Sequence, residues 1–280
     1  MKQTATKIVW AIVMIVLFSC SKGKSSSGST TPPEKAYTIS GIIKDVSGNP
    51  VPGARIRVEN PTGDNIHFTA RTNEAGRYSV TVSAIGGYKI YAWKEVELNN
   101  EVYQVRLGME KDADYDAFSV PASGVVKNFT WKLSGRIPDR TISRENGTGY
   151  FGGTIKFINY NSLADEMPAG TQVTIQLTPT TGARYLDGSA AAGKIVEKKF
   201  TIAAGVGQAY YINDIPATHY KITASATLNG NTKNVNIGSG TPDVFHNSAE
   251  HYFKSEGGSG SFENGLGSPN EYSFYVMFAR

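Results

Sequence analysis

The chain has 280 residues, of which 40% are hydrophobic and 19% charged, so it can bury one or two ordinary cores. The formal net charge is +4, but Lys2 and Lys7 carry two of these charges and the other basic residues are interspersed with acidic ones, which argues against a nucleic-acid partner. Because 30 glycines and 12 prolines punctuate the chain, the composition favours many short strands over long helices and predicts an all-β class.

The N-terminus has the order of features found in an export signal. The two lysines precede an apolar run over residues 8–18, which is shorter than the roughly 20 residues that a membrane-spanning helix needs. The run closes on Leu17-Phe18-Ser19-Cys20, which resembles the lipobox of bacterial lipoproteins. The resemblance implies that residues 1–19 are a signal peptide and that Cys20 becomes the lipidated first residue of the mature chain. A plain secretory signal with a chance cysteine, or a short uncleaved anchor, is the alternative.

Residues 20–36 are expected to form the lipidated start and a flexible tether. The stretch is rich in Ser, Gly, Thr and Pro and has too little apolar content to fold on its own. Cys20 is the single cysteine, so an acylated Cys20 leaves no thiol for a disulfide or for a cysteine metal site.

From Tyr37 onward, apolar and polar residues alternate, as they do in strands with one buried face. Alternating strands are predicted around residues 39–43, 54–58, 78–82, 88–92, 96–98 and 103–107, with turns at 47–50, 60–64 and 72–77.

Four segments of this region resemble the carboxypeptidase regulatory-like domain, and they occur in the family's order. They are SGIIKD at residues 40–45, GNPVPGA at 48–54, TNEAGRY at 72–78 and GYKI at 87–90. The resemblance implies a transthyretin-like (prealbumin-like) β-sandwich, and we predict it as a first domain over residues 37–110.

The rest of the chain predicts a second domain. Residues 111–150 are interpreted as a connector plus the first strand of that domain, because Val125, Phe129, Trp131 and Leu133 alternate. Residues 151–280 are predicted to form a second β-sandwich, with strands at 154–158, 171–177, 199–202, 210–212, 220–228 and 272–278. The stretch 215–224 echoes 85–92, which suggests a diverged internal repeat and a related sandwich. Convergence on the same strand pattern in a different sandwich is the alternative.

No residue pattern predicts catalysis. The one histidine cluster, residues 246–251, has neither the His-Glu-x-x-His nor the His-x-x-Glu-His spacing of zinc peptidases, and we interpret it as a solvated loop. No Gly-x-Ser-x-Gly elbow occurs in a strand-to-helix setting. We therefore expect no catalytic residue, no metal and no cofactor.

Exposed aromatic rings can stack on sugars, so the tyrosines and tryptophans are candidate ligand contacts, although most should serve packing. The candidates are Tyr91, Trp93, Trp131, Tyr150 and Tyr211.

Together these features predict a non-catalytic, lipid-anchored β-sandwich protein of the cell envelope, similar to those of Bacteroidetes-type bacteria, that serves as a binding or structural module. Two alternatives stay open: a cell-surface glycan-binding lipoprotein, and a fimbrial-type subunit that assembles by donor-strand exchange. The expected partners are the membrane, through the lipid on Cys20, and a glycan or an envelope protein. Ser21 favours the outer membrane by resemblance to lipoprotein sorting rules, whereas Lys22 and Lys24 leave open whether the protein faces the periplasm or the outside.

Overall fold

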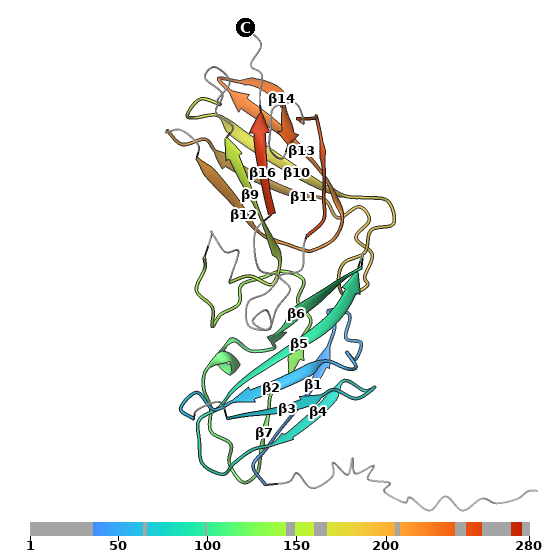
Figure 1. Cartoon of the computed structure of the whole chain (residues 1–280), viewed down its shortest axis with the longest axis vertical. Helices are drawn as coiled ribbons and strands as arrows, with labels where there is room; N and C mark the ends of the chain where they lie inside the picture. The colour runs from blue at the N-terminus through green and yellow to red at the C-terminus, as the bar shows by residue number, and fades with distance from the viewer. Residues whose placement is uncertain are drawn as a thin grey trace, which may run out of the picture. The chain divides into compact units, whose positions relative to one another are not determined.

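The computed structural model describes residues 36–63, 66–98, 100–143, 149–159, 167–204, 208–238, 245–253 and 270–275, all within the compact unit Glu34–Arg280. Cys20 and the predicted signal peptide lie outside the described residues. The described chain is nearly all β-structure, which confirms the predicted class (Figure 1). One short 3-10 helix, η1 (Asp112–Tyr115), interrupts the strands.

The first group of strands forms one continuous path of pairings. Its members are β1 (Thr38–Lys44), β2 (Arg55–Glu59), β3 (His67–Arg71), β4 (Arg77–Thr81), β5 (Lys89–Leu98), β6 (Glu101–Met109), β7 (Val125–Val126) and β8 (Phe129–Thr130). They pair in the order β3-β2-β5-β6-β8-β1-β4, with β7 beside β1. Only two residue pairs join β6 to β8, so the path turns there and gives two layers, β3-β2-β5-β6 and β8-β1-β4.

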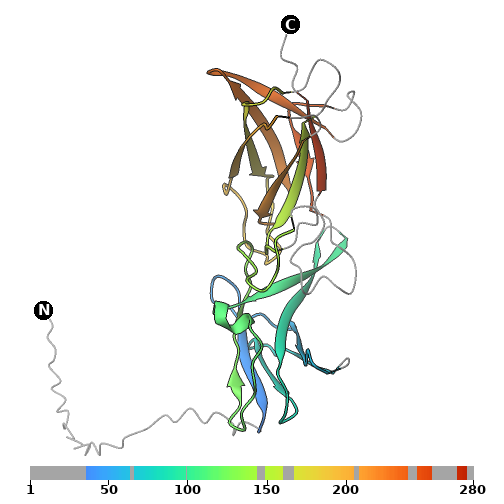
Figure 2. The same cartoon turned by 90° about the vertical axis from the view of Figure 1, so that its left-hand side faces the viewer.

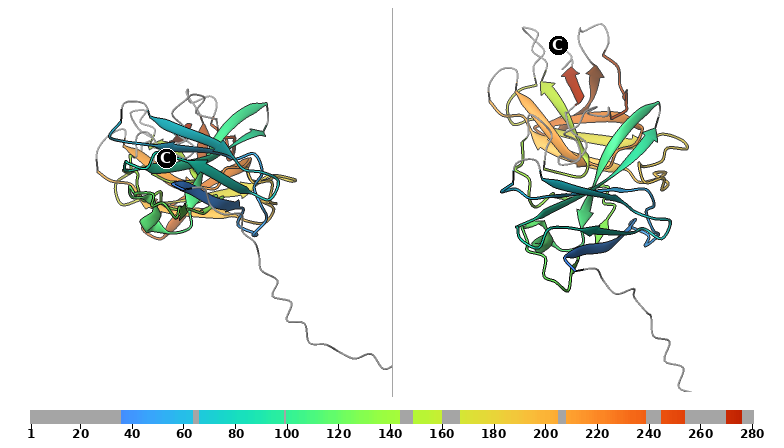
Figure 3. Two further views of the ribbon diagram at one scale, coloured as in Figure 1. Left: turned by 90° about the horizontal axis from the view of Figure 1, so that it is seen from below. Right: turned by 60° about the horizontal axis from the view of Figure 1, so that its bottom comes forward.

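The second group repeats this path strand for strand. Its members are β9 (Gly153–Asn159), β10 (Gln172–Pro179), β11 (Val196–Thr201), β12 (Ala209–Ile215), β13 (Tyr220–Leu228), β14 (Asn231–Gly238), β15 (Ala249–His251) and β16 (Asn270–Tyr275). The order is β11-β10-β13-β14-β16-β9-β12, with β15 beside β13. The strands β9 to β14 correspond in sequence to β1 to β6, and β16 corresponds to β8. Both groups are seen from two sides in Figures 1 and 2, and the twist of their strands in Figure 3.

The two segments that the sequence suggests as a repeat, residues 85–92 and 215–224, occupy equivalent positions in the two sandwiches. Tyr88 stands before β5 and Tyr220 begins β13, and both side chains are almost completely buried. The Tyr88 hydroxyl donates to the Ser83 carbonyl at 2.8 Å, and the Tyr220 hydroxyl donates to the Pro216 carbonyl at 2.7 Å. Each ring therefore fills a core position while its hydroxyl fixes the preceding turn.

The segment around residues 125–133 does not begin the second domain, contrary to the sequence interpretation. β7 pairs with β1 in parallel, and β8 pairs with both β1 and β6. The first sheet therefore extends to Thr130. The alternation of Val125 and Phe129 identified a strand correctly, but alternation does not say which neighbour a strand hydrogen-bonds.

Gly41 of β1 is a point where the fold excludes any side chain. A Cβ added there would lie 2.0 Å from the Lys127 carbonyl oxygen and 2.8 Å from Cε1 of Tyr78. The Tyr78 hydroxyl donates to that same carbonyl, so the main chain around Lys127 is held in place. Glycine at position 41 is thus required by packing rather than by backbone dihedral angles.

Gly41→Ala is expected to reduce the free energy of unfolding by about 1–3 kcal/mol, because the obstacle is main chain that must shift. Urea denaturation of the full chain measures this change. Gly87→Ala is the matched control, since a Cβ at Gly87 meets nothing within 4 Å. Equal unfolding midpoints for the two variants would show that β1 can move away from Lys127 without loss.

Candidate functional site

A groove lies at the open side of the second sandwich, between β11 and β12. These two strands are the two ends of the pairing path, and among the described residues no strand pairs with their outer edges. The groove has a volume of about 450 Å³ and is lined by Lys198, Lys199, Phe200 and residues 209–213. Because consecutive residues of each strand line it, and side chains alternate between faces, the walls include main chain as well as side chains.

Two stacked aromatic rings are among the residues that line the groove. Phe200 of β11 and Tyr210 of β12 stack with their centroids 4.5 Å apart and their planes 15° apart. The Ala203 amide donates to the Tyr210 hydroxyl at 2.9 Å, which fixes this ring against the β11–β12 connection. Both rings also pack against the hydrophobic core.

Two neighbouring lysines line the groove in different ways. The exposure of β11 alternates, with Val196, Lys198 and Phe200 half-buried on the face toward the core. Lys199 points to the other face and forms an exposed ion pair with Glu197 at 3.0 Å. Lys198 forms no ion pair with any residue that the structure describes. The groove therefore places a cation on the inner face of an edge strand.

The aromatic candidates from the sequence fall into two sets. Tyr91, Trp93 and Trp131 are buried, with 5%, 9% and 7% of their surface exposed, so as they lie they present no open face for stacking on a sugar. Tyr150 is half-buried, with the Arg136 guanidinium 5.9 Å from its ring centroid. Tyr211 is half-buried and lines the groove, which it alone of the five does.

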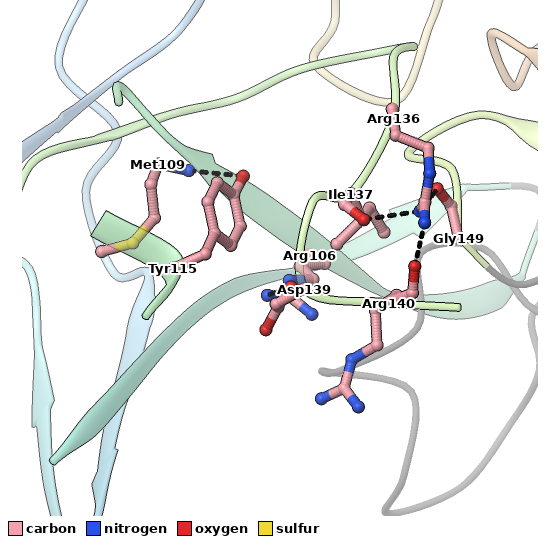
Figure 4. A network of polar contacts seen from close by, with 8 residues as sticks. All are labelled: Arg106, Met109, Tyr115, Arg136, Ile137, Asp139, Arg140 and Gly149. Carbon is pink, nitrogen blue, oxygen red and sulfur yellow. Dashed lines mark hydrogen bonds and ion pairs between the residues drawn. The ribbon is translucent and has the colours of Figure 1, made fainter. Parts of the chain in front are cut away.

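A buried ion pair holds the connector between the two sandwiches against β6. Arg106 donates to the Asp139 carboxylate at 2.9 Å, and these side chains are only 2% and 9% exposed. The Arg106 guanidinium also lies 5.3 Å from the ring centroid of Tyr91 and 5.7 Å from that of Tyr115. Burial raises the pKa of the Tyr115 hydroxyl to about 12. This cluster packs the connector against β6, and Figure 4 shows the Arg106–Asp139 pair together with Tyr115.

The same connector is stiffened by Arg136, whose guanidinium donates to main-chain carbonyls. It donates to Ile137 at 2.5 Å, to Gly149 at 2.6 Å and to Arg140 (Figure 4). At the second sandwich, the Asp214 carboxylate accepts hydrogen bonds from the amides of Gly135 at 2.7 Å and Gly152 at 3.3 Å. Asp214 has a φ of 62° and lies where the β9–β12 register shifts. This irregularity in β12 therefore positions the carboxylate that accepts the two hydrogen bonds from the Gly135 and Gly152 amides.

The histidine cluster is a solvated loop only in part: His246 is exposed, as the sequence interpretation expects, whereas His251 is buried, contrary to it. His246 pairs its main chain with Ile237, and His251 ends β15 with no exposed surface. Burial, and secondarily the nearby His219, lowers the pKa of the His251 imidazole to about 3. His251 is therefore neutral in the folded protein at neutral pH.

His219 forms the outer part of this region. Its Nε2 lies 3.1 Å from the Glu250 carboxylate and its Nδ1 lies 2.9 Å from the Thr180 hydroxyl, while Tyr252 stacks on its ring at 3.6 Å. Both imidazole nitrogens are occupied, so the arrangement holds β15 against the sandwich rather than presenting a free base. Within the described ranges, no group of three or more potential ligands could hold a metal ion.

Hydrophobicity gives one further finding about the described part of the chain: it contains no helix long and apolar enough to cross a membrane.

The fold and the groove define an all-β protein built from two sandwiches of the same topology. Residues 38–118 match the family model of the carboxypeptidase regulatory-like domain, which confirms the resemblance seen in the sequence. This family match does not indicate a catalytic family. A comparison with curated protein sequences gives no significant match.

Several solved structures are weakly similar to the chain. A Streptococcal ancillary pilin is 9% identical, with a TM-score of 0.22 over 71% of this chain and 58% of the pilin. A leucine-rich repeat protein from Bacteroides thetaiotaomicron is 14% identical, with a TM-score of 0.25 over 72% of this chain and 23% of that protein. A DUF3823 family protein from Bacteroides uniformis is 12% identical, with a TM-score of 0.19 over 78% and 99% of the two chains. TM-scores this low do not establish a shared fold, so no conclusion here rests on these likenesses.

Sequence reasoning missed Lys198 and Phe200 as groove residues. Their signal was present but weak, since Val196, Lys198 and Phe200 alternate with Glu197 and Lys199 and so place a lysine on an apolar face. The groove itself depends on which strands remain unpaired, and a single strand's sequence does not carry that information.

Proposed function

We propose that this protein is a lipid-anchored component of the bacterial cell envelope that acts as a non-catalytic binding module. The observation that carries the binding role is the groove between β11 and β12, which combines two strand edges and a lysine that have no partner among the described residues with a stacked aromatic pair. The anchoring role is supported by the lipobox-like Leu17-Phe18-Ser19-Cys20 and by the tether-like composition of residues 20–36. An outer-membrane location is part of the proposal, supported by Ser21 after the cysteine.

The anchor is tested by Cys20→Ala in the full chain expressed in its bacterial host. Each buried methylene contributes about 0.8 kcal/mol to membrane binding, so two or more acyl chains hold a protein firmly and their loss should release it. We expect wild type in the membrane fraction and Cys20→Ala in the soluble fraction after cell lysis. Ser19→Ala is the matched control, since alanine is also small and should still permit cleavage. A Cys20→Ala variant that stays with the membrane contradicts the proposal.

Glycan binding is the second candidate, and one observation favours it. Tyr211 lines the groove together with Lys199 and the amide side chain of Asn213. An aromatic ring flanked by polar groups is the arrangement that binds sugars. A glycan array probed with the full chain and with Tyr211→Ala tests this candidate, and the expected result is a signal that the variant loses. An array without signal counts against it.

A further inference from the structure

The strands that form the walls of the groove indicate which class of ligand enters it; this inference rests on the binding role proposed above. Both walls are edge strands of a sandwich, and an edge strand carries a row of main-chain N–H and C=O groups that no neighbour satisfies. β11 pairs only with β10, and β12 only with β9, among the described residues. Five consecutive residues of β12, Ala209 to Asn213, line the groove, against three of β11. β12 therefore contributes the larger number of residues to the groove.

The charge of the groove is one-sided. Its lining contains two lysines and no carboxylate. The Lys199 charge is offset by Glu197, whereas Lys198 faces inward without an ion-pair partner among the described residues. On β11, Lys198 and Phe200 are two residues apart and therefore share one face of the strand. Tyr210 and Ile212 share one face of β12 for the same reason. An inward cation in a groove that is also lined by the buried Ile212 matches an acidic side chain that enters from the open side.

The stacked pair of Phe200 and Tyr210 favours an extended peptide as the ligand rather than a sugar. Phe200 and Tyr210 use one ring face each on the other, and the Tyr210 hydroxyl already accepts the Ala203 amide. The stacked faces of these two rings are therefore not available to a sugar. Main-chain groups and alternating side chains are the features that an extended peptide matches.

We propose that the groove between β11 and β12 binds an extended peptide segment with a carboxylate side chain. The peptide adds as a strand to the free edge of β12 and directs one acidic side chain inward to Lys198. Affinity comes from main-chain hydrogen bonds, and selectivity for an acidic residue comes from the unpaired ammonium group.

The test uses the full chain purified in detergent and a fluorescent ten-residue peptide of alternating valine and glutamate. Fluorescence anisotropy measures binding of this peptide, of a valine–lysine analogue, and of the valine–glutamate peptide N-methylated at alternate amides. The expected result is binding of the first peptide alone, because N-methylation removes main-chain donors without changing charge. Equal binding of the N-methylated peptide overturns the proposal, as does a failure of the valine–glutamate peptide to bind.

The variants Lys198→Met and Lys199→Met locate the acidic contact. Methionine keeps an apolar stem at each position, and thermal unfolding of each variant checks that the fold is retained. Lys198→Met is expected to weaken peptide binding by about tenfold or more, as loss of a charge-assisted hydrogen bond does, whereas Lys199→Met should stay within about twofold of wild type. Equal affinities for the two variants overturn the assignment of Lys198.

Two other outcomes have distinct meanings. If Lys198→Met self-associates in sedimentation experiments while peptide binding is unchanged, the inward lysine protects the edge from pairing with a second copy, and the proposal is wrong. If polygalacturonate binds and the peptide does not, the ligand is an acidic glycan and the peptide proposal is likewise overturned. Neither outcome bears on the anchor, which Cys20→Ala tests by fractionation.

Discussion

Asp139→Ala is expected to lower the free energy of unfolding by about 3–5 kcal/mol, because it leaves the Arg106 guanidinium buried without its carboxylate. Arg106 is 2% exposed and lies between β6 and the connector, so it cannot reach water without displacing Tyr91 and Tyr115. Urea denaturation of the full chain, followed by tryptophan fluorescence, measures the loss. Part of the cost should appear as loosening of the connector, seen as faster proteolysis near residues 136–143.

Two variants make this prediction specific. Glu197→Ala breaks an ion pair whose partners are 69% and 49% exposed, and it should change stability by no more than about 1 kcal/mol. Arg106→Met combined with Asp139→Leu removes both buried charges and should recover most of the stability lost in Asp139→Ala, because paired charges in a core contribute little beyond what apolar packing gives. A loss of under 1 kcal/mol in Asp139→Ala would mean that water reaches Arg106.

The protein is expected to lose stability as the pH falls from about 6.5 toward 3, with His251 as a principal cause. The pKa of His251 is about 3 in the folded protein against 6.5 for an ordinary histidine. Between these values the unfolded chain binds a proton that the folded chain does not, so acid favours unfolding. The contribution is fully present above pH 6.5 and declines by about 1.4 kcal/mol per pH unit below it, for a total of a few kcal/mol.

His251→Gln separates this effect from the titration of carboxylates. Glutamine does not take up a proton, so the variant should show a shallower decline of the urea midpoint between pH 6.5 and 4 than wild type does. Glu250 and His219 face the same region, and both are retained in the variant. Parallel pH profiles for the two proteins would contradict the burial of a neutral imidazole at this position.

The sequence predicted the fold class and the carboxypeptidase regulatory-like segment correctly, although the first sheet extends beyond the predicted boundary at residue 110. The glycine-containing turns and the alternation of β1, β2 and β4 are local signals, and the strand predicted at residues 220–228 coincides with β13. β14 was missed although Asn229-Gly230 precedes it with φ values of 50° and 80°, which is the hairpin turn that this dipeptide favours. Its polar residues hid the alternation of Val235 and Ile237, both of which are buried.

The candidate site was less accessible to sequence reasoning, because exposure of an aromatic residue depends on what packs over it. Tyr91 and Trp93 stand in a strand that looks amphipathic, yet Arg106 and Arg140 cover the Tyr91 ring from other elements. His251 was placed in solvent because polar residues and glycines surround it in the chain, whereas β15 pairing with β13 carries it into the core. Lys198 becomes a candidate only once β11 is known to be an edge.

In each sandwich the first and last strands in chain order pair in parallel, and this has a mechanical consequence. β1 pairs in parallel with β8, and β9 pairs in parallel with β16. A pull applied to the two ends of one sandwich would drag these neighbours in opposite directions along their length. Their hydrogen bonds would then bear the load together in shear instead of opening one after another like a zipper. Each sandwich therefore resists a pull between its two ends more than an antiparallel pairing of the same two strands would.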